Sequence, residues 1–191
     1  MIFSHGLGAH SAFYTATYHT LAAHGYLVIA INHQDESCLY TENKDGADIP
    51  FTQKDFYDYP FRQKQIVIRS EEVLLTIDAL RKLSPELHFK IFGGSAPNAK
   101  IDMSELVLAG HSFGAGTMIA VDSKLKTSEQ PRALLLMDPW VFAIHERVME
   151  GEISVKCPVQ MIHTENFHDH VDKKPFDSWG CVQKILKEGR C

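Results

Sequence analysis

The most informative segment of this chain is Leu106-Val107-Leu108-Ala109-Gly110-His111-Ser112-Phe113-Gly114. Its first four residues form an apolar run of strand length, and the pattern Gly-x-Ser-x-Gly follows directly. This order is typical of a tight strand-to-helix turn, in which small flanking residues let a serine project its hydroxyl from the top of a sheet. We therefore predict that Ser112 is a nucleophile. The alternative is a glycine-rich turn with a purely structural role.

Strands and helices alternate on both sides of this segment. Apolar runs typical of buried strands occupy residues 26–32, 106–109, 133–137 and 158–163, and we expect both faces of 26–32 to be covered. Helical patterns occupy residues 11–24, 61–83 and 179–187. In the 61–83 helix one face carries the apolar residues Ile66, Val73, Leu74, Ile77 and Leu80. The alternation predicts an α/β fold: one domain over residues 1–191, with a mostly parallel sheet flanked by helices.

Composition narrows the function classes. The chain has 191 residues, 45% of them hydrophobic and 23% charged, which is ordinary for a globular protein. A formal net charge of −5 provides no basic surface for nucleic acid. No apolar stretch is long enough to span a bilayer and no signal peptide is recognisable, which favours a cytoplasmic protein by default and leaves secretion open. The cysteines lack metal-ligand spacing, and we expect free thiols at Cys38, Cys157, Cys181 and Cys191.

A second glycine-rich segment stands at the start of the chain, Phe3-Ser4-His5-Gly6-Leu7-Gly8-Ala9. Its His-Gly-x-Gly pattern is typical of the loop that supplies one amide of an oxyanion hole in esterases. Attack on an ester places negative charge on the carbonyl oxygen, and two preorganised N–H groups must meet it. We predict that these are the amides of Leu7 and Phe113. A glycine-rich strand end without catalytic meaning is the alternative.

A carboxylate closes the 133–137 strand. Asp138 lies at the carboxyl end of that strand, the edge of a parallel sheet at which active sites collect. There it would orient a histidine and stabilise the imidazolium. The alternative is a helix cap before Pro139, and Asp35 and Asp169 are weaker candidates for the acid. Residues 33–60 are long and aromatic for a connection, and we expect them to form a lid or an entrance.

Four blocks together carry a resemblance to a known family: residues 1–9, 31–35, 110–117 and 137–142. In order and spacing they resemble the platelet-activating-factor acetylhydrolases, the secreted and intracellular type II α/β-hydrolases. The resemblance extends from Met1 to about Phe167. It implies an α/β-hydrolase fold and a calcium-independent serine esterase without cofactor or metal. It also implies Ser112 as nucleophile, Asp138 as triad acid, and Leu7 and Phe113 in the oxyanion hole.

The implied substrate is a phospholipid at a membrane or lipoprotein surface, with an acetyl or short oxidised acyl chain at its sn-2 position. Trp140 is expected near the pocket, with a core position as the alternative. The block 31–35 contains His33 and Asp35, which match the family but have no evident chemical role. Two other functions stay open: a general carboxylesterase or lipase of the same fold, and a non-catalytic relative that binds a lipid or a partner.

One departure from the family concerns the triad histidine, which the resemblance places in a loop after a further strand. The chain ends at Cys191 before such a strand, and only Met1-Ile2-Phe3 precede the first glycine-rich loop. We therefore expect a central fragment of a longer esterase, incomplete at both ends. The first strand should lie between 26–32 and 106–109. His145, His163, His168 and His170 follow Asp138, and His168 or His170 is the candidate replacement base. Together with Glu165 these histidines lack a metal-site spacing, so we predict a solvated loop.

Overall fold

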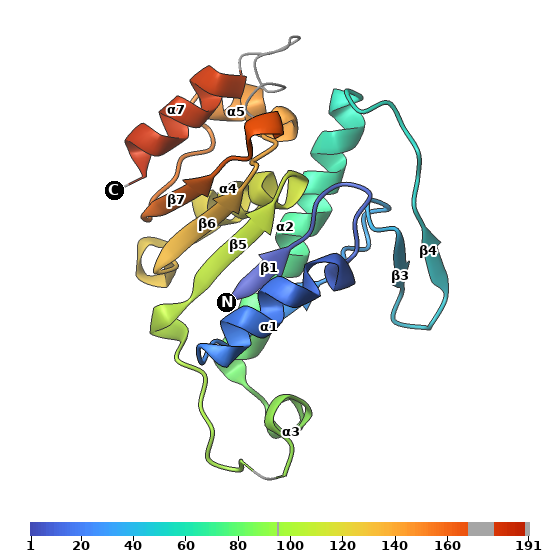
Figure 1. The fold of residues 1–191 in the computed structure, drawn as a ribbon, viewed down its shortest axis with the longest axis vertical. Coiled ribbons are helices and arrows are strands. Elements are labelled where there is room, and N and C mark those ends of the chain that lie inside the picture. Colours follow the sequence, from blue (N-terminus) through green and yellow to red (C-terminus); the bar gives the residue numbers. More distant parts are fainter. Residues whose placement is uncertain (95, 168–177, 190–191) are drawn as a thin grey trace.

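The computed structural model describes residues 1–94, 96–167 and 178–189. A five-stranded sheet with the order β2-β1-β5-β6-β7 runs through its centre, and every neighbouring pair of strands is parallel (Figure 1). The strands are β1 (Ile2–Ser4), β2 (Ile29–Ile31), β5 (Val107–His111), β6 (Ala133–Met137) and β7 (Val159–Ile162). The strands predicted at 106–109, 133–137 and 158–163 and the central place of the first strand are thus confirmed.

Helices cover both faces of this sheet. The 3-10 turn η1 (Ser11–Tyr14) and helix α1 (Thr15–Ala23) lie on one face, and α2 (Tyr59–Lys82) and α4 (Phe113–Lys124) lie on the other (Figure 1). Side chains alternate along a strand, so neighbouring residues of β1 serve opposite faces. Phe3 packs against Tyr14 and Tyr18, with ring centroids 4.7 and 5.2 Å away. Ile2 instead joins the core beneath α2 and α4.

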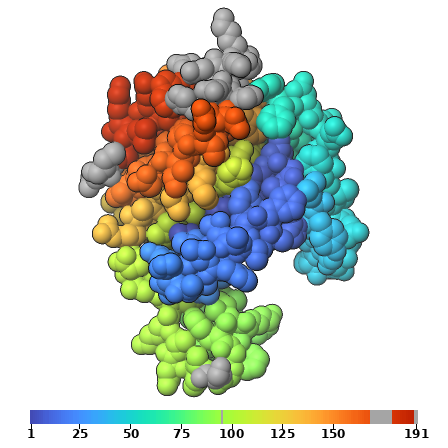
Figure 2. Space-filling view, viewed as in Figure 1, coloured from blue at the N-terminus to red at the C-terminus, as the bar shows by residue number. Residues whose placement is uncertain are grey.

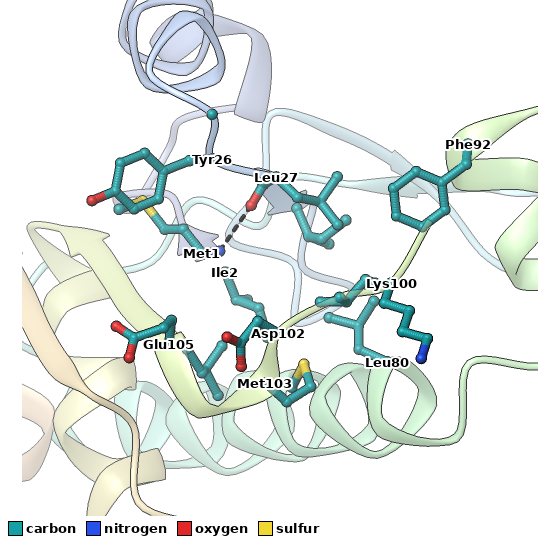
Figure 3. A pocket seen from close by; sticks show the side chains of 14 residues that line it. Met1, Ile2, Tyr26, Leu27, Leu80, Phe92, Lys100, Asp102, Met103 and Glu105 are labelled. Carbon is teal, nitrogen blue, oxygen red and sulfur yellow. Dashed lines mark hydrogen bonds between the residues drawn. The ribbon is translucent and has the colours of Figure 1, made fainter. Parts of the chain in front are cut away.

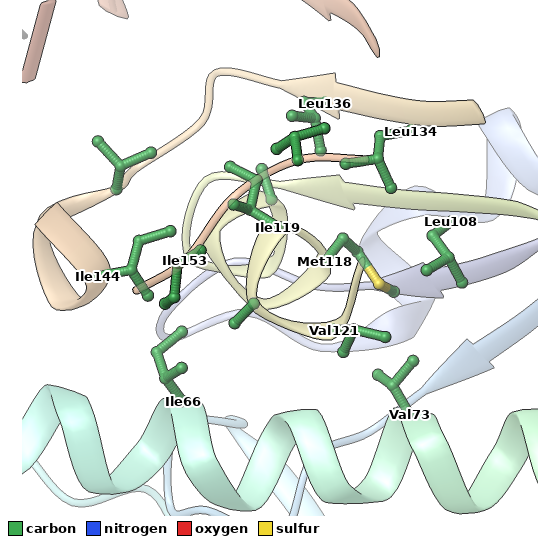
Figure 4. Packing of buried hydrophobic residues seen from close by; sticks show 14 of the residues in the cluster. Ile66, Val73, Leu108, Met118, Ile119, Val121, Leu134, Leu136, Ile144 and Ile153 are labelled. Carbon is green, nitrogen blue, oxygen red and sulfur yellow. The ribbon is translucent and has the colours of Figure 1, made fainter. Parts of the chain in front are cut away.

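The main core lies between the sheet and the pair α2 and α4. Leu108 of β5 and Leu134 and Leu136 of β6 meet Met118 and Ile119 of α4, and α2 closes this layer with Ile66 and Val73 (Figure 4). Four of the five residues predicted for the apolar face of α2 are fully buried, and Leu74 is half-buried. The amino-terminal part of the same face buries polar side chains instead: Arg62, Gln65, Arg69 and Ser70.

The ends of α2 follow from local chemistry. The side chain of Asp58 accepts a hydrogen bond from the Phe61 N–H, and Pro60 occupies the first turn, where a missing N–H has no cost. Leu83 ends the helix with φ at 35°, in the left-handed region. A shorter helix that the sequence analysis did not predict, α3 (Pro85–Phe92), follows and projects with the next loop beyond the sheet (Figure 2).

One expectation needs correction. The predicted strand 26–32 shortens to β2 and is only half-buried, because β1 is its single partner among the described strands and β2 lies at the edge of their sheet. Residues 33–60, predicted to be more than a plain connection, contain the antiparallel hairpin β3 (Tyr40–Glu42) and β4 (Asp48–Pro50) and the start of α2, and their role as a lid or an entrance stays a prediction.

The remaining described elements frame the sheet. They are the 3-10 turns η2 (Met103–Glu105), η3 (Thr127–Glu129) and η4 (Phe142–Ile144), and the helices α5 (His145–Met149) and α7 (Ser178–Glu188). Cys38 and Cys157 are free thiols, as expected, and Cys181 is in no disulfide, whereas Cys191 lies outside the described residues. Among the described helices, none combines the length and apolarity needed to cross a bilayer.

Candidate active site

Ser112 lies at the turn between β5 and α4. Its backbone has φ 54° and ψ −116°, a conformation that residues other than glycine rarely adopt. Backbone hydrogen bonds stabilise this conformation. The Ser112 N–H donates to the Met137 carbonyl at 2.8 Å, and the Ser112 carbonyl accepts from the Trp140 and Ala115 N–H groups, both at 3.0 Å. The half-buried serine is therefore fixed to the end of β6 as well as to its own helix.

The glycines beside Ser112 are required by close backbone approach. A Cβ atom placed on Gly114 would lie 2.0 Å from the Ser4 carbonyl oxygen, and one on Gly110 would lie 2.4 Å from the Gly114 carbonyl carbon. Neither contact can be relieved by a flexible side chain, because the atoms met are backbone. The start of α4 therefore packs directly on the end of β1, and the Gly-x-Ser-x-Gly pattern has a steric basis here.

The loop after β1 reaches the same place. A Cβ atom on Gly6 would lie 3.3 Å from the Ser112 Cβ, so the Gly6 backbone borders the serine side chain. The Gly6 N–H donates to the Tyr14 hydroxyl at 3.1 Å, and the Gly6 carbonyl accepts from His5 Nδ1 at 2.7 Å. A trans peptide is planar, with its C=O and N–H pointing in opposite directions. Holding the Gly6 carbonyl therefore also fixes the direction of the Leu7 N–H.

The Leu7 and Phe113 amides differ from their neighbours in hydrogen bonding. Gly8 donates to the Ser37 carbonyl at 2.9 Å and Ser112 donates to Met137. Within the part of the chain that the structure describes, neither the Leu7 nor the Phe113 N–H donates to a protein acceptor. Two unused donors thus flank Ser112, as an oxyanion hole requires.

Asp138 stands one residue past β6. Its φ is 44°, and its N–H donates to the Ile162 carbonyl at 2.8 Å, which ties the turn to β7. One carboxylate oxygen accepts from the Thr164 N–H at 2.7 Å, and the other accepts from the Thr164 hydroxyl at 2.9 Å. His111 Nε2 lies 3.9 Å from Oδ2, too far for a hydrogen bond. The Asp138 side chain is 12% exposed and lies at the same sheet edge as Ser112.

The structure describes two of the four histidines that were considered as the catalytic base, His163 and His145. His163 follows β7 and is half-buried, with ring centroids of Phe167 and Trp179 both 6.0 Å away. His145 begins α5. His168, His170 and the weaker acid candidate Asp169 lie outside the described residues.

Trp140 combines the two positions considered for it. Its backbone N–H donates to the Ser112 carbonyl. The residue as a whole is 9% exposed, and its ring packs on Phe113, Phe56 and Phe142 at centroid distances of 5.3, 4.9 and 5.6 Å. The residue lies beside the serine and also belongs to the core. Phe56, near the end of the predicted lid, brings that segment to the site.

A buried polar cluster that the sequence did not predict lies behind the first loop. His33 Nε2 lies 2.7 Å from the Ser4 hydroxyl, and His33 Nδ1 lies 2.5 Å from a Glu72 carboxylate oxygen. Burial lowers the pKa of His33 well below its ordinary value and raises that of Glu72 to about 7. Burial, with the nearby Arg69 cation, lowers the pKa of His5 to about 3. Both histidines are therefore neutral at pH 7.

The other missed residues are Tyr14 and His111, whose hydroxyl and Nδ1 atoms are 2.8 Å apart. A signal for the cluster was present: the buried stripe of α2, continued toward its amino end at helical spacing, reaches Arg69, Gln65 and Arg62. Asp35, the weaker candidate for the acid, belongs to this cluster, where its carboxylate faces Arg69 at 3.6 Å.

A cavity of about 370 Å³ lies away from Ser112 (Figure 3). It is lined by Met1, Tyr26, Leu27 and Glu105, which precede or begin β1, β2 and β5. Ser112 follows β5, so this cavity occupies the opposite end of the strands and is separate from the candidate site.

Comparison with solved structures supports the fold. The chain is similar to a structure described as "Crystal structure of esterase PE8", with a TM-score of 0.50 and 15% identity over 99% of this chain and 79% of that one. At this identity the likeness concerns the fold, and it agrees with the parallel sheet and flanking helices described above. The chain has an α/β-hydrolase fold.

Curated relatives agree with the family that the four sequence blocks resemble. A platelet-activating factor acetylhydrolase of Cavia porcellus is 30% identical over 98% of this chain and 44% of its own length. A putative phospholipase A2 of Schizosaccharomyces pombe is 22% identical over 93% of this chain and 48% of its own length. The chain thus spans about half the length of these relatives. The family model described as "Platelet-activating factor acetylhydrolase, isoform II" matches residues 1–184, and the chain belongs to that family.

Proposed function

We propose that this chain carries the nucleophile, the acid and the oxyanion hole of a serine esterase. Its substrate would be a phospholipid with an acetyl or a short oxidised acyl chain at the sn-2 position. The observation that carries the proposal is the convergence at Ser112: a strained turn, the Gly6 backbone beside the serine Cβ, and two amides without protein acceptors. Family membership supports the substrate class.

The reaction would proceed in two halves. The Ser112 oxygen attacks the acyl carbon while a histidine takes the hydroxyl proton, and the carbonyl electron pair becomes an oxyanion facing the Leu7 and Phe113 N–H groups. The bond to the glycerol oxygen then breaks, and that oxygen receives the proton as the lysophospholipid leaves. Water repeats the sequence on the acyl-enzyme and releases the short acid.

Asp138 would orient the histidine and stabilise its charged form. Its two bonds to Thr164 hold the carboxylate at the sheet edge where Ser112 stands. The resemblance places the base after a further strand, and within this chain His168 and His170 are the candidates. No step requires a metal ion, so a chelator should leave turnover unchanged.

A fluorophosphonate probe tests the serine. Labelling of the wild type that is lost in Ser112→Ala and kept in Ser104→Ala, an exposed serine on η2, would support the nucleophile. A wild type that stays unlabelled under these conditions would favour the non-catalytic relative. Loss of labelling in His168→Asn/His170→Asn would assign the base to the segment between β7 and α7.

Substrate competition tests the acyl class. Phosphatidylcholines with sn-2 acetyl, sn-2 palmitoyl and a soluble acetyl ester would be compared at equal concentration in the presence of lipid vesicles. The proposal expects the sn-2 acetyl lipid to be cleaved fastest. Equal cleavage of the palmitoyl lipid, or preference for the soluble ester, would favour a general lipase or carboxylesterase.

A further inference from the structure

Arg69 of α2 lies between the two segments that carry the proposed oxyanion-hole amides. Its Nη2 donates to the His5 carbonyl at 2.7 Å, and its guanidinium carbon lies 4.6 Å from the centre of the Phe113 ring. The side chain has no exposed surface. A single planar cation thus touches the loop after β1 on one side and the first residue of α4 on the other.

The contact with His5 acts on the Leu7 amide through two successive peptide planes. The first plane joins the His5 carbonyl to the Gly6 N–H, and it is held at one end by Arg69 and at the other by Tyr14. The second joins the Gly6 carbonyl to the Leu7 N–H, and His5 Nδ1 holds its carbonyl. Both peptide planes are rigid. Loss of the Arg69 hydrogen bond would therefore let the first plane rotate, and the Leu7 N–H would change direction with it.

The contact with Phe113 acts on the second amide. The Phe113 ring is completely buried between the guanidinium and the Trp140 ring. A cation over an aromatic face attracts it, and more so in a dry environment. The side chain that follows Ser112 is therefore fixed by Arg69 on one face.

The block 31–35 gains a role in this arrangement. Asp35 presents a buried carboxylate 3.6 Å from Arg69 Nε, and its carbonyl accepts from Gln65 at 2.8 Å. His33 bonds to Ser4 and Glu72, which ties the end of β1 to α2 one turn past Arg69. These two residues, singled out by the sequence but without a chemical task, hold the arginine and the strand that leads to the loop.

We propose that Arg69 is a positioning residue that sets the separation and direction of the Leu7 and Phe113 N–H groups, with Asp35 as its counter-charge. This inference rests on the proposed function, because it assigns those two amides to the oxyanion. Stability alone does not require the pair: replacing a buried ion pair by uncharged groups of similar size is often neutral or stabilising.

The test uses the full chain with three changes. Arg69→Met/Asp35→Asn removes both buried charges together, Arg69→Lys keeps the charge but loses the planar fork, and Arg81→Met is the control. Arg81 lies on the same helix, paired with Glu129 at 3.1 Å and far from the loop. Thermal unfolding identifies variants that fold.

Two kinds of measurement are compared. The first is kcat and KM on a short soluble acetyl ester, together with inhibition by a short alkyl trifluoromethyl ketone. Addition of the Ser112 oxygen to that ketone forms a C–O bond and leaves an oxyanion in place of the carbonyl, with the proton on the base. The second is hydrogen exchange of the Leu7 and Phe113 amides by NMR, which needs no turnover.

A misdirected amide should lower kcat by roughly ten- to a hundredfold and weaken inhibition by the ketone by a similar factor. KM should stay within about threefold of the wild-type value. Amide exchange at Leu7 and Phe113 should rise at least about tenfold in the double variant, with Arg69→Lys between it and the wild type and Arg81→Met unchanged. If the double variant does not fold, Arg69→Lys alone must show the effect.

Two failures are distinguishable. A wild type without turnover or Ser112 labelling overturns the proposed function, and amide exchange then decides the role of Arg69. Wild-type exchange and wild-type ketone affinity in the folded Arg69 variants overturn the positioning role. A loss confined to melting temperature, with kcat unchanged, does the same.

Discussion

Tyr14 and His111 connect two loops that are far apart in the sequence. The Tyr14 hydroxyl lies 2.8 Å from His111 Nδ1 and also accepts the Gly6 N–H at 3.1 Å. A hydroxyl that accepts from an amide can donate its own proton to an unprotonated ring nitrogen. His111 then carries its proton on Nε2, the atom that faces Asp138 at 3.9 Å. One phenol thereby joins the loop after β1 to the turn that holds Ser112.

Replacing Tyr14 with phenylalanine tests this connection. The Gly6 N–H and His111 Nδ1 both lose their partner, and a part-buried unpaired donor costs about 1–3 kcal/mol of unfolding free energy. Turnover of a short acetyl ester should fall roughly tenfold, because Gly6 precedes the Leu7 amide. Urea unfolding and ester kinetics measure the two effects. Tyr26→Phe is the control, since its ring is exposed and lies at the other end of the sheet.

Gly114 should tolerate no side chain. A methyl group there would overlap the Ser4 carbonyl at 2.0 Å, and β1 and α4 would have to separate to admit it. We expect Gly114→Ala to lower the unfolding free energy by about 3 kcal/mol or more. The exposed Gly94 is the matched control: its nearest atom is a Phe89 ring carbon at 3.7 Å, so Gly94→Ala should stay within about 0.5 kcal/mol of the wild type. Equal stability of the two variants would contradict the steric reading.

The sequence predicted what local patterns encode. Apolar runs located β5, β6 and β7, the stripe of Ile66, Val73, Ile77 and Leu80 located the buried face of α2, and the glycines located both loops. These features depend on neighbours in the chain, so periodicity and spacing are enough to find them.

What the sequence did not predict depends on contacts between distant segments. His33, Arg69 and Glu72 look like ordinary solvated residues until the sheet order brings β1, β2 and α2 together. Asp35 is an acid near a candidate site, yet only the fold shows that it faces Arg69 and not the serine. The edge position of β2 is likewise a property of the whole sheet, and it explains why an apolar run is only half-buried.

Asp138→Asn should separate catalysis from stability. Asparagine keeps an acceptor for the Thr164 N–H and can donate to the Thr164 hydroxyl, so the turn should survive and the melting temperature should change little. Without the negative charge the imidazolium loses its stabilisation, and turnover should drop about a hundred- to ten-thousandfold. The exposed Asp78→Asn serves as the control. A variant with more than a tenth of wild-type turnover would remove Asp138 from the triad.

The buried cluster also predicts how stability changes with pH. The folded-state pKa of His5 is about 3 and that of His33 lies well below 6.5, so their contributions are present above pH 6.5 and are lost as pH falls. Between pH 7 and 5 protonation of His5 in the unfolded state should cost roughly 2 kcal/mol of unfolding free energy, and His33 acts in the same direction. Glu72 acts in the opposite sense. Its folded-state pKa is about 7 against an ordinary 4.5, so its contribution is present below 4.5 and is lost as pH rises toward 7.

Glu72→Gln therefore isolates the carboxylate. Over the same fall from pH 7 to 5, Glu72 restores roughly 2 kcal/mol by taking up a proton in the folded state, which offsets part of the loss from the two histidines. Glutamine can still accept the Gln34 N–H and donate to His33 Nδ1, so the network keeps its hydrogen bonds but no longer titrates at that position. Urea unfolding at pH 7, 6 and 5 should then show a steeper loss of stability in Glu72→Gln than in the wild type, by roughly 2 kcal/mol across the range. Glu86→Gln on the exposed helix α3 should follow the wild-type curve, and a Glu72→Gln curve parallel to both would mean that Glu72 is already ionised at pH 5 in the folded protein.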